Sequence, residues 1–308
     1  MTEPAHPGAG AEGGDRAAAA AARGRRLGWI LAAALLVVWV AFHLMSRFTT
    51  RQSLTSWDVA ALRYAGSFVC VLPLLAWRGL PRISLPRVAA IVVFAGLGFP
   101  LGAYLGYRFA PAAHGATVMA AGLPVVATLL GVAMGQARLT WRRVASLVTV
   151  VAGSLLLAQA TAGVWEGAWV GDLIFLAAVS SWAVYTVLVQ RWQLPAIEAT
   201  LAIGLATAPV YLPLWWLAAP SGMAEASWQA ILVQLVFHGA FASVVAGLLY
   251  TRCVTALGAG PTTMLGAAVP GLAALFAWPL LGEALPAVAL VAIGLVTLGL
   301  GLSVTRAR

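Results

Sequence analysis

The feature that most constrains this chain is a series of ten apolar stretches, each close to the length of a membrane-spanning helix. A helix needs about 20 consecutive apolar residues to cross the hydrocarbon core of a bilayer. The chain is 62% hydrophobic and 9% charged, whereas about 25% of the residues in soluble domains are charged. We therefore expect an all-α integral membrane protein with ten transmembrane helices. They fall near residues 28–48, 57–77, 88–108, 113–135, 144–160, 169–190, 196–217, 229–251, 260–281 and 286–304.

The ten stretches divide into two sets of five that resemble each other in sequence. Trp39 in the first stretch corresponds to Trp182 in the sixth, and Pro124 in the fourth corresponds to Pro270 in the ninth. The separation between paired residues lengthens slowly along the chain, as expected of a duplicated unit with small insertions. Because each copy holds an odd number of spans, the two copies must enter the bilayer in opposite orientations. The sequence thus predicts two inverted five-helix repeats, a plan that recurs among secondary transporters.

Three segments follow from this division. Residues 1–26 are expected to form a disordered cytoplasmic tail, residues 27–158 the first repeat and residues 169–305 the second. The tail is rich in Ala, Gly and Pro, and arginines stand just ahead of the first apolar stretch. No small-residue cleavage site follows that stretch, so we interpret it as a retained span rather than a signal peptide.

The arginines predict the orientation in the membrane. All 18 basic residues are arginine, and with the N-terminus inside only Arg47, Arg51 and Arg108 fall on outer segments, while Arg63 lies within the second span. The positive-inside rule then places both termini in the cytoplasm. No basic face stands apart from the membrane flanks, so the net charge of +9 does not indicate a nucleic-acid partner.

A family resemblance rests on the ninth span and the turn that follows it. Pro270 lies in the middle of that span, and the turn reads Gly282-Glu283-Ala284-Leu285. A duplicated ten-span chain with these features resembles the drug/metabolite transporter superfamily, in its EamA-type exporter branch. The first copy departs from the pattern, because it has Gln136 where the family commonly has Glu.

This resemblance implies a secondary transporter that exports small metabolites by alternating access around a central cavity. The superfamily includes carriers of amino acids, nucleotide sugars, triose phosphates and drugs. The layout of this chain most resembles bacterial exporters of aromatic amino acids, so the expected substrate is an aromatic or other neutral amino acid. The same resemblance implies the cytoplasmic (inner) membrane of a bacterium as the location. The expected partners are this solute and the lipid bilayer, and the expected state is a monomer or a weak homodimer.

Aromatic and small polar side chains are expected to line the cavity, because a pocket for a small organic solute is mostly apolar with a few oriented polar groups. The best candidates lie at helical spacings of three and four on the first, third, sixth and eighth spans. Ordinary helix packing is the alternative explanation for all of them. The candidate substrate-binding residues are Trp39, Phe42, His43, Tyr104, Trp182, Tyr185, Thr186, His238 and Phe241.

Hinges are expected where small residues and prolines recur in both repeats. Small residues stand every fourth position at Gly98, Gly102 and Gly106 in the third span and at Gly239, Ser243 and Gly247 in the eighth. This spacing lets helix backbones approach closely, so these spans are expected to slide or rock, with static packing as the alternative. Prolines remove a backbone donor and can kink a span. The predicted structural hinges are Pro124, Pro270, Gly102 and Gly247.

The charged and titratable residues bear on coupling. Intramembrane acids are the usual proton or sodium relays of coupled transporters, and we expect none near the midplane, so the sequence favours a facilitated carrier. Glu283 is expected to cap the tenth span. His43 and His238 leave open a proton-coupled exporter, since histidine titrates near neutral pH. Arg63 is expected to snorkel outward or to pair with Asp58, with a substrate-carboxylate anchor as the functional alternative.

Other classes of membrane protein lack support in the sequence. Cys70 and Cys253 have no ligand spacing to a histidine or a carboxylate, so we expect no metal site and no cofactor. An enzyme is not expected, because the metalloprotease, serine-hydrolase and prenyl-diphosphate motifs are absent. A channel would show a polar pore-lining repeat or a filter loop. A purely structural membrane protein would leave the mid-span tryptophans and histidines unexplained.

Overall fold

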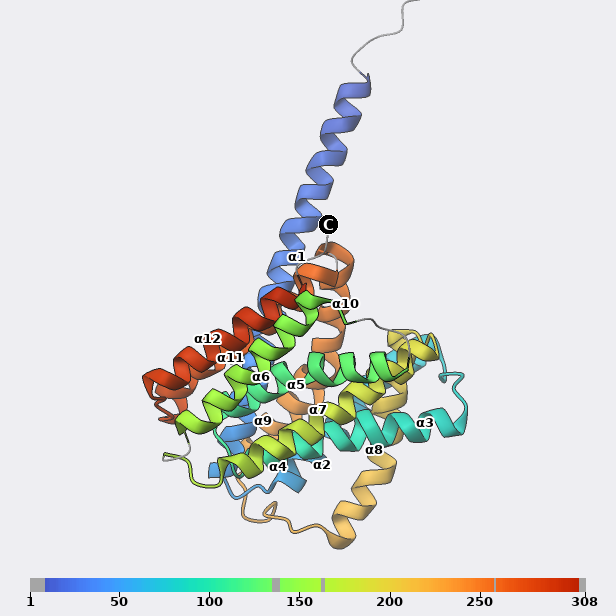
Figure 1. The fold of residues 1–308 in the computed structure, drawn as a ribbon. Helices are drawn as coiled ribbons and strands as arrows, with labels where there is room; N and C mark the ends of the chain where they lie inside the picture. The colour runs from blue at the N-terminus through green and yellow to red at the C-terminus, as the bar shows by residue number, and fades with distance from the viewer. Residues whose placement is uncertain (1–8, 135–138, 162–163, 258, 305–308) are drawn as a thin grey trace, which may run out of the picture.

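The computed structural model describes residues 9–134, 139–161, 164–257 and 259–304, and every regular element within these ranges is helical (Figure 1). Eight spans are single helices, and the third and eighth spans each join three consecutive elements. The single helices are α1 (Ala9–Phe48), α2 (Ser56–Arg78), α5 (Ala112–Ala133), α6 (Trp141–Thr161), α7 (Ala168–Arg191), α8 (Ala196–Ala218), α11 (Ala259–Leu281) and α12 (Ala287–Val304), and a short 3-10 turn, η1 (Thr49–Arg51), follows α1. The ten predicted spans are confirmed.

The third and eighth spans both have a π-helical middle. The third consists of α3 (Leu85–Ile91), η2 (Val92–Gly98) and α4 (Phe99–Gly106), and the eighth of α9 (Trp228–Gln234), η3 (Leu235–Val245) and α10 (Ala246–Leu257). A π-helix bonds residue i to residue i+5 and is often found at functional sites. Because its turn is wider than that of an α-helix, residues three apart in η2 or η3 do not share a face as they would in an α-helix.

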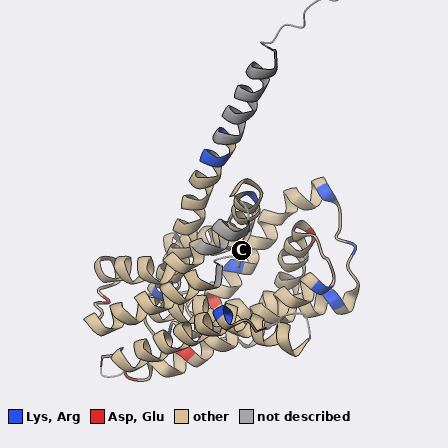
Figure 2. Ribbon diagram, turned by 45° about the horizontal axis from the view of Figure 1, so that its top comes forward, with Lys and Arg blue, Asp and Glu red and all other residues tan. Residues whose placement is uncertain are grey.

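Length and hydropathy identify the same helices as membrane spans. Eight of the described helical spans are long and apolar enough to cross a bilayer, and residues 265–281 and 287–302 form two shorter apolar helices. Charged residues lie mainly near helix ends, and long stretches of helix between the ends carry none (Figure 2). This is the distribution that a low-dielectric membrane core requires, since a charge at its centre is costly.

Helix α1 is longer than the sequence analysis expects. Residues 9–26 were assigned to a disordered tail, but they continue α1 without a break and project from the bundle (Figure 1). The assignment of residues 1–26 to a separate tail stays a prediction, and the helix starts earlier than the expected first span. The reason is local, because a run of alanines, the residue with the highest helix propensity, leads directly into the first span with no proline after residue 9.

The two halves of the chain pack against each other reciprocally. Equivalent helices of the two copies are in contact: α2 with α8, α5 with α11, and α6 with α12. Contacts between non-equivalent helices also occur in matching pairs. Helix α4 of the first repeat packs on α7 of the second, and its counterpart α10 packs on α1. In the same way α5 packs on α7, and its counterpart α11 packs on α1. A two-fold relation between two five-helix units produces such pairs. The inverted repeats predicted from the sequence are the architecture of the bundle.

The small residues of the third span bring it close to α7. A Cβ atom added at Gly102 would lie 2.7 Å from the Cβ of Ala178, and Gly106 faces the ring of Phe175. The eighth span differs, because nothing lies within 4 Å of a Cβ added at Gly247. Pro124 lies inside α5 and Pro270 inside α11, and both helices continue past the proline. Motion at any of these four positions stays a prediction.

The two ends of the bundle are named here after arginines that lie there. The Arg47 end holds the end of α1 and the starts of α2 and α5. The Arg78 end holds the end of α2, the start of α8 and the end of α10. The candidate site lies between them, nearer the Arg47 end.

Candidate substrate-binding site

Phe42 of α1 lies at the centre of a group of aromatic rings inside the bundle. Its ring centroid is 6.3 Å from that of Phe99, with the rings stacked, 6.1 Å from Tyr104 and 5.8 Å from His238. These three neighbours come from the third and eighth spans. Phe42 therefore connects elements of both repeats.

The ring group continues to α7 through Phe99. The Phe99 and Trp182 centroids are 5.1 Å apart, and those of Trp182 and Tyr185 are 4.9 Å apart. Such separations are typical of interacting aromatic pairs. Phe42, Phe99 and Trp182 are only partly buried, so the group keeps accessible ring surface. We call it the aromatic cluster, and its members are Phe42, Phe99, Tyr104, Trp182, Tyr185 and His238.

A hydrogen-bond chain borders the aromatic cluster on the side of α2. Arg63 is partly buried, and its Nη1 atom donates to the Tyr104 hydroxyl at 3.4 Å. The same hydroxyl lies 2.9 Å from Nδ1 of His238. His238 is fully buried, and within the described part of the chain its Nε2 has no partner; nor does the amide of Gln234, buried one turn earlier. We call Arg63, Tyr104 and His238 the Arg63 chain.

The expected pair between Arg63 and Asp58 does not form. Asp58 is fully buried at the start of α2, where it makes a capping box with Thr55. Its carboxylate also accepts from the indole N–H of Trp215 at 2.9 Å and from the hydroxyl of Ser221 at 2.6 Å. These donors satisfy the carboxylate at the Arg47 end, and its role is to fix the start of α2.

His43 links the aromatic cluster to the Arg47 end. Its ring contacts Phe42 edge-on at 5.4 Å, and its Nδ1 lies 2.5 Å from the hydroxyl of Tyr107. Tyr107 is fully buried and packs on Phe175 with centroids 4.7 Å apart. Gly115 has to be a glycine here, because a Cβ would lie 2.5 Å from the Tyr107 ring. An aromatic ring that anchors a helix at the membrane interface would be exposed, whereas Tyr107 is fully buried.

A buried ion pair ties the helices together at the Arg47 end. Arg47 Nε lies 2.6 Å from Glu283 Oε1, and Glu283 Oε2 accepts the backbone N–H of Ala112 at 2.9 Å. Arg47 also donates to the Tyr107 carbonyl at 2.5 Å and lies over the ring of Trp165 at 5.4 Å. Glu283 thus caps α5 of the first repeat, and the expectation that it caps the tenth span was wrong. Its counterpart Gln136 lies outside the described residues.

His114 forms a second buried polar junction, and it was not among the residues predicted from the sequence. The side chain is fully buried in α5, with Nδ1 2.9 Å from Asp172 of α7 and Nε2 2.8 Å from the hydroxyl of Thr161 in α6. Both ring nitrogens are satisfied, which is the state expected of a structural histidine. No local pattern indicates this contact, because its partners are far apart in the sequence.

Besides His43, which links the aromatic cluster to the Arg47 end, three of the predicted site residues lie outside the cluster. Trp39 packs beside Tyr250 of α10, with ring centroids 6.2 Å apart. The Thr186 hydroxyl donates to the carbonyl of Trp182 in its own helix at 2.8 Å. Phe241 is 44% exposed, and the wide turn of η3 explains why it does not share the face of His238 three residues earlier.

Phe99 belongs to the aromatic cluster but was not predicted from the sequence. It is the first residue of α4, directly after η2. The spacings of three and four residues used for the third span selected Tyr104, and Phe99 lies five residues before Tyr104 in the same helix, so those spacings do not select it. A stacked partner for Phe42 could be found only once the helices are in place.

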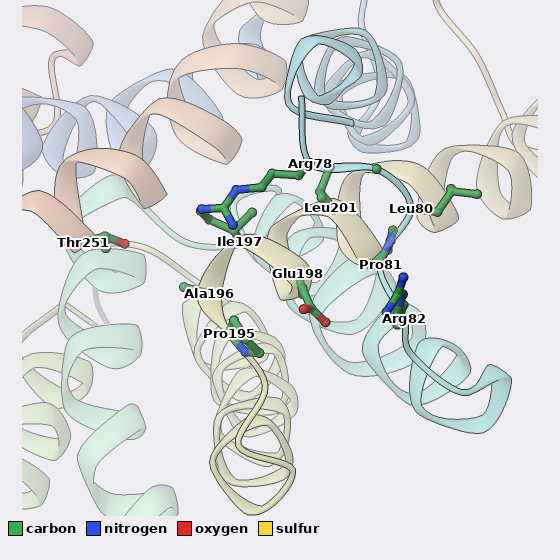
Figure 3. Close-up of a pocket in the computed structure, with 11 residues that line it drawn as sticks. Arg78, Leu80, Pro81, Arg82, Pro195, Ala196, Ile197, Glu198, Leu201 and Thr251 are labelled. Carbon is green, nitrogen blue, oxygen red and sulfur yellow. The ribbon is translucent and has the colours of Figure 1, made fainter. Parts of the chain in front are cut away.

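A hollow of about 900 Å³ opens at the Arg78 end (Figure 3). The loop after α2, the start of α8 and Thr251 of α10 line it, and Figure 3 shows Arg78, Arg82 and Glu198 around it. A smaller hollow of about 570 Å³ at the Arg47 end is lined by the segment after α1 with Arg47, Arg51 and Arg108. Neither hollow is lined by the aromatic cluster. Among the described residues no group of three His, Cys, Asp or Glu side chains could hold a metal ion.

Comparison with known proteins identifies the family. The model of the EamA-like transporter family matches residues 26–159 and, a second time, residues 169–305. The chain therefore belongs to the EamA-like transporter family of the drug/metabolite transporter superfamily. It is a multi-pass membrane transporter and not an enzyme.

Comparison with solved structures supports the fold. A structure titled "Crystal structure of protein" is similar to this chain with a TM-score of 0.62 at 20% sequence identity, over 90% of this chain and 96% of that one. At this identity the similarity concerns the fold alone. No curated protein matches the sequence.

Proposed function

We propose that this secondary transporter exports aromatic or other neutral amino acids from the bacterial cytoplasm, with the aromatic cluster as its substrate site. Family membership establishes transport of small metabolites. The observation that supports the finer assignment is the ring group around Phe42, which draws on both repeats. Its partly accessible rings offer the stacking surface that an aromatic solute needs, and its few polar atoms can orient the solute.

The location of the site supports alternating access. Substrate sites in inverted-repeat transporters lie at the repeat interface, where one half can rock against the other. Phe42 belongs to the first repeat, and it contacts His238 of the second. At the Arg47 end, the Arg47–Glu283 pair joins α1 to the turn after α11. In our proposal this junction closes the site toward the outside while the Arg78 end faces the cytoplasm.

The proposed orientation rests on the arginine distribution. Arg78, Arg82, Arg87, Arg142, Arg143, Arg191 and Arg252 all belong to the Arg78 end, on the flanks of α2, α3, α6, α7 and α10. The positive-inside rule assigns that end to the cytoplasm of the bacterial inner membrane. Both termini then lie inside. We propose a monomer or weak homodimer as the working unit.

We further propose facilitated transport down the gradient of the substrate. Asp58 and Glu283 support this, because each buried carboxylate is held by several fixed donors and serves the packing of helix ends. A relay carboxylate in a coupled carrier has to exchange protons or sodium during the cycle.

Counterflow in proteoliposomes tests the proposal. Vesicles loaded with unlabelled L-phenylalanine, L-tryptophan or L-leucine should transiently accumulate the labelled amino acid, with saturation and competition among them. Failure to exchange any of these amino acids would contradict the assigned substrate class. A second arm imposes a pH gradient without internal substrate: uphill accumulation would show that transport is proton-coupled through a group such as His238 or His43.

A further inference from the structure

Arg63 is a membrane-embedded cation whose charge no carboxylate neutralises within the described part of the chain. It lies in α2 two turns from the helix start, and its hydrogen-bond partner is the uncharged hydroxyl of Tyr104. A guanidinium remains protonated in proteins. Ionisable groups inside a membrane are costly and are found where a substrate or an ion passes. An unneutralised arginine beside the aromatic cluster therefore indicates a ligand rather than a packing contact.

The buried and partly buried acids at this end of the bundle already have partners. Asp58 accepts from Trp215 and Ser221, Glu283 pairs with Arg47, and Asp172 contacts His114. None of these carboxylates can turn to Arg63 without leaving its own donors unsatisfied. The position thus keeps one net positive charge in the resting protein.

The Arg63 chain also presents a second donor. Because Arg63 donates to the Tyr104 oxygen, the Tyr104 hydroxyl proton is free to bond Nδ1 of His238. A neutral imidazole that accepts at Nδ1 carries its proton on Nε2. That Nε2 is buried without a partner in the described residues, so it is a donor that lacks an acceptor. A side chain in this state is completed by an acceptor group of a ligand.

We propose that Arg63 binds the carboxylate of the substrate and that His238 Nε2 donates to the same polar end, so the transporter selects aromatic or apolar monocarboxylates. This rests on the proposed function and gives it a substrate class. A carboxylate accepts hydrogen bonds only and matches the fork of a guanidinium. A doubly charged phosphate would leave one uncompensated negative charge in the site, which disfavours it. The rings of Phe42 and Phe99 would contact the apolar part of the solute.

Ligand-induced thermal stabilisation of the purified full-length protein tests this without requiring transport. The probes are L-phenylalanine, its amide, which keeps the ring and the amine but lacks the carboxylate, and 3-phenylpropionate, which keeps the carboxylate but lacks the amine. The wild-type protein should respond to the two acids at concentrations at least tenfold lower than to the amide. Arg63→Gln should abolish this preference, and Arg63→Lys should retain part of it.

A matched control removes a positive charge elsewhere. Arg108 is exposed after α4, and Arg108→Gln should keep the full preference for acids. If Arg63→Gln folds and still prefers the acids, or if the wild-type protein shows no preference, the anchor is overturned. If Arg63→Gln does not fold, two results still test the proposal: the preference of the wild-type protein for acids over the amide, and the partial preference expected of Arg63→Lys.

The result also separates this inference from the assignment of amino acids as substrates. Arg63-dependent binding of 3-phenylpropionate without binding of phenylalanine would support the anchor and contradict the amino-acid assignment. If phenylalanine is exchanged with the same half-saturating concentration by Arg63→Gln and by the wild type, the amino-acid assignment is supported and the role of Arg63 as carboxylate anchor is contradicted.

Discussion

At the scale of single residues, the polar side chains inside this bundle divide by whether they are satisfied. Glu283 is 1% exposed and has both oxygens occupied, by Arg47 and by the backbone N–H of Ala112. His238 is equally buried, but one of its ring nitrogens has no partner among the described residues. We interpret the first arrangement as structural and the second as part of a binding site.

The Glu283 pair gives a prediction at this scale. Glu283→Gln should destabilise the protein by about 3 to 5 kcal/mol, because it leaves Arg47 buried without a counter-charge. Thermal unfolding in detergent measures the effect, and Glu225→Gln, at an exposed carboxylate, is the control. An unchanged midpoint in Glu283→Gln would show that the pair does not hold the Arg47 end together.

At the scale of helices, the third and eighth spans correspond in the repeat but differ in packing. Gly102 in α4 touches Ala178 of α7, whereas Gly247 in α10 faces open space. In the sequence both glycines belong to equivalent series of small residues at every fourth position. Their packing differs because each glycine meets a neighbour from another part of the chain, and the repeat does not make those neighbours identical.

This difference predicts opposite responses to the same substitution. Gly102→Ala should destabilise the protein by about 1 to 3 kcal/mol through overpacking. Gly247→Ala should be neutral or stabilise it by up to about 1 kcal/mol, since alanine favours a helix more than glycine does. Unfolding midpoints of the two variants provide the comparison. Equal losses in both would contradict the packing described for α4 and α10.

At the scale of the whole molecule, the sequence predicts the architecture well because membrane spans are a long-range, redundant signal. Ten apolar stretches and paired residues such as Pro124 and Pro270 were enough to predict two inverted repeats. Side-chain contacts between distant helices could not be predicted from the sequence. The wide π-helical turn of η3 displaced Phe241 from the expected face, and the partner of Glu283 lies in the other repeat.

The orientation gives a prediction for the whole molecule. With Cys70 and Cys253 replaced by alanine, Glu225→Cys at the Arg47 end and Arg82→Cys at the Arg78 end provide one exposed thiol each. A membrane-impermeant maleimide applied to intact cells should label Glu225→Cys and should reach Arg82→Cys only after the membrane is opened. The reverse pattern would place the Arg78 end outside.

The most direct test of the central claim is the half-saturating concentration for aromatic amino-acid counterflow in a Phe42→Ala variant. Phe42 contacts three other rings of the aromatic cluster, so its loss should weaken substrate binding at least about tenfold, equivalent to about 1.4 kcal/mol. Trp216→Ala, which removes a 79% exposed ring on α8, should leave the concentration unchanged. If Phe42→Ala exchanges the substrate with wild-type affinity, the aromatic cluster is not the substrate site.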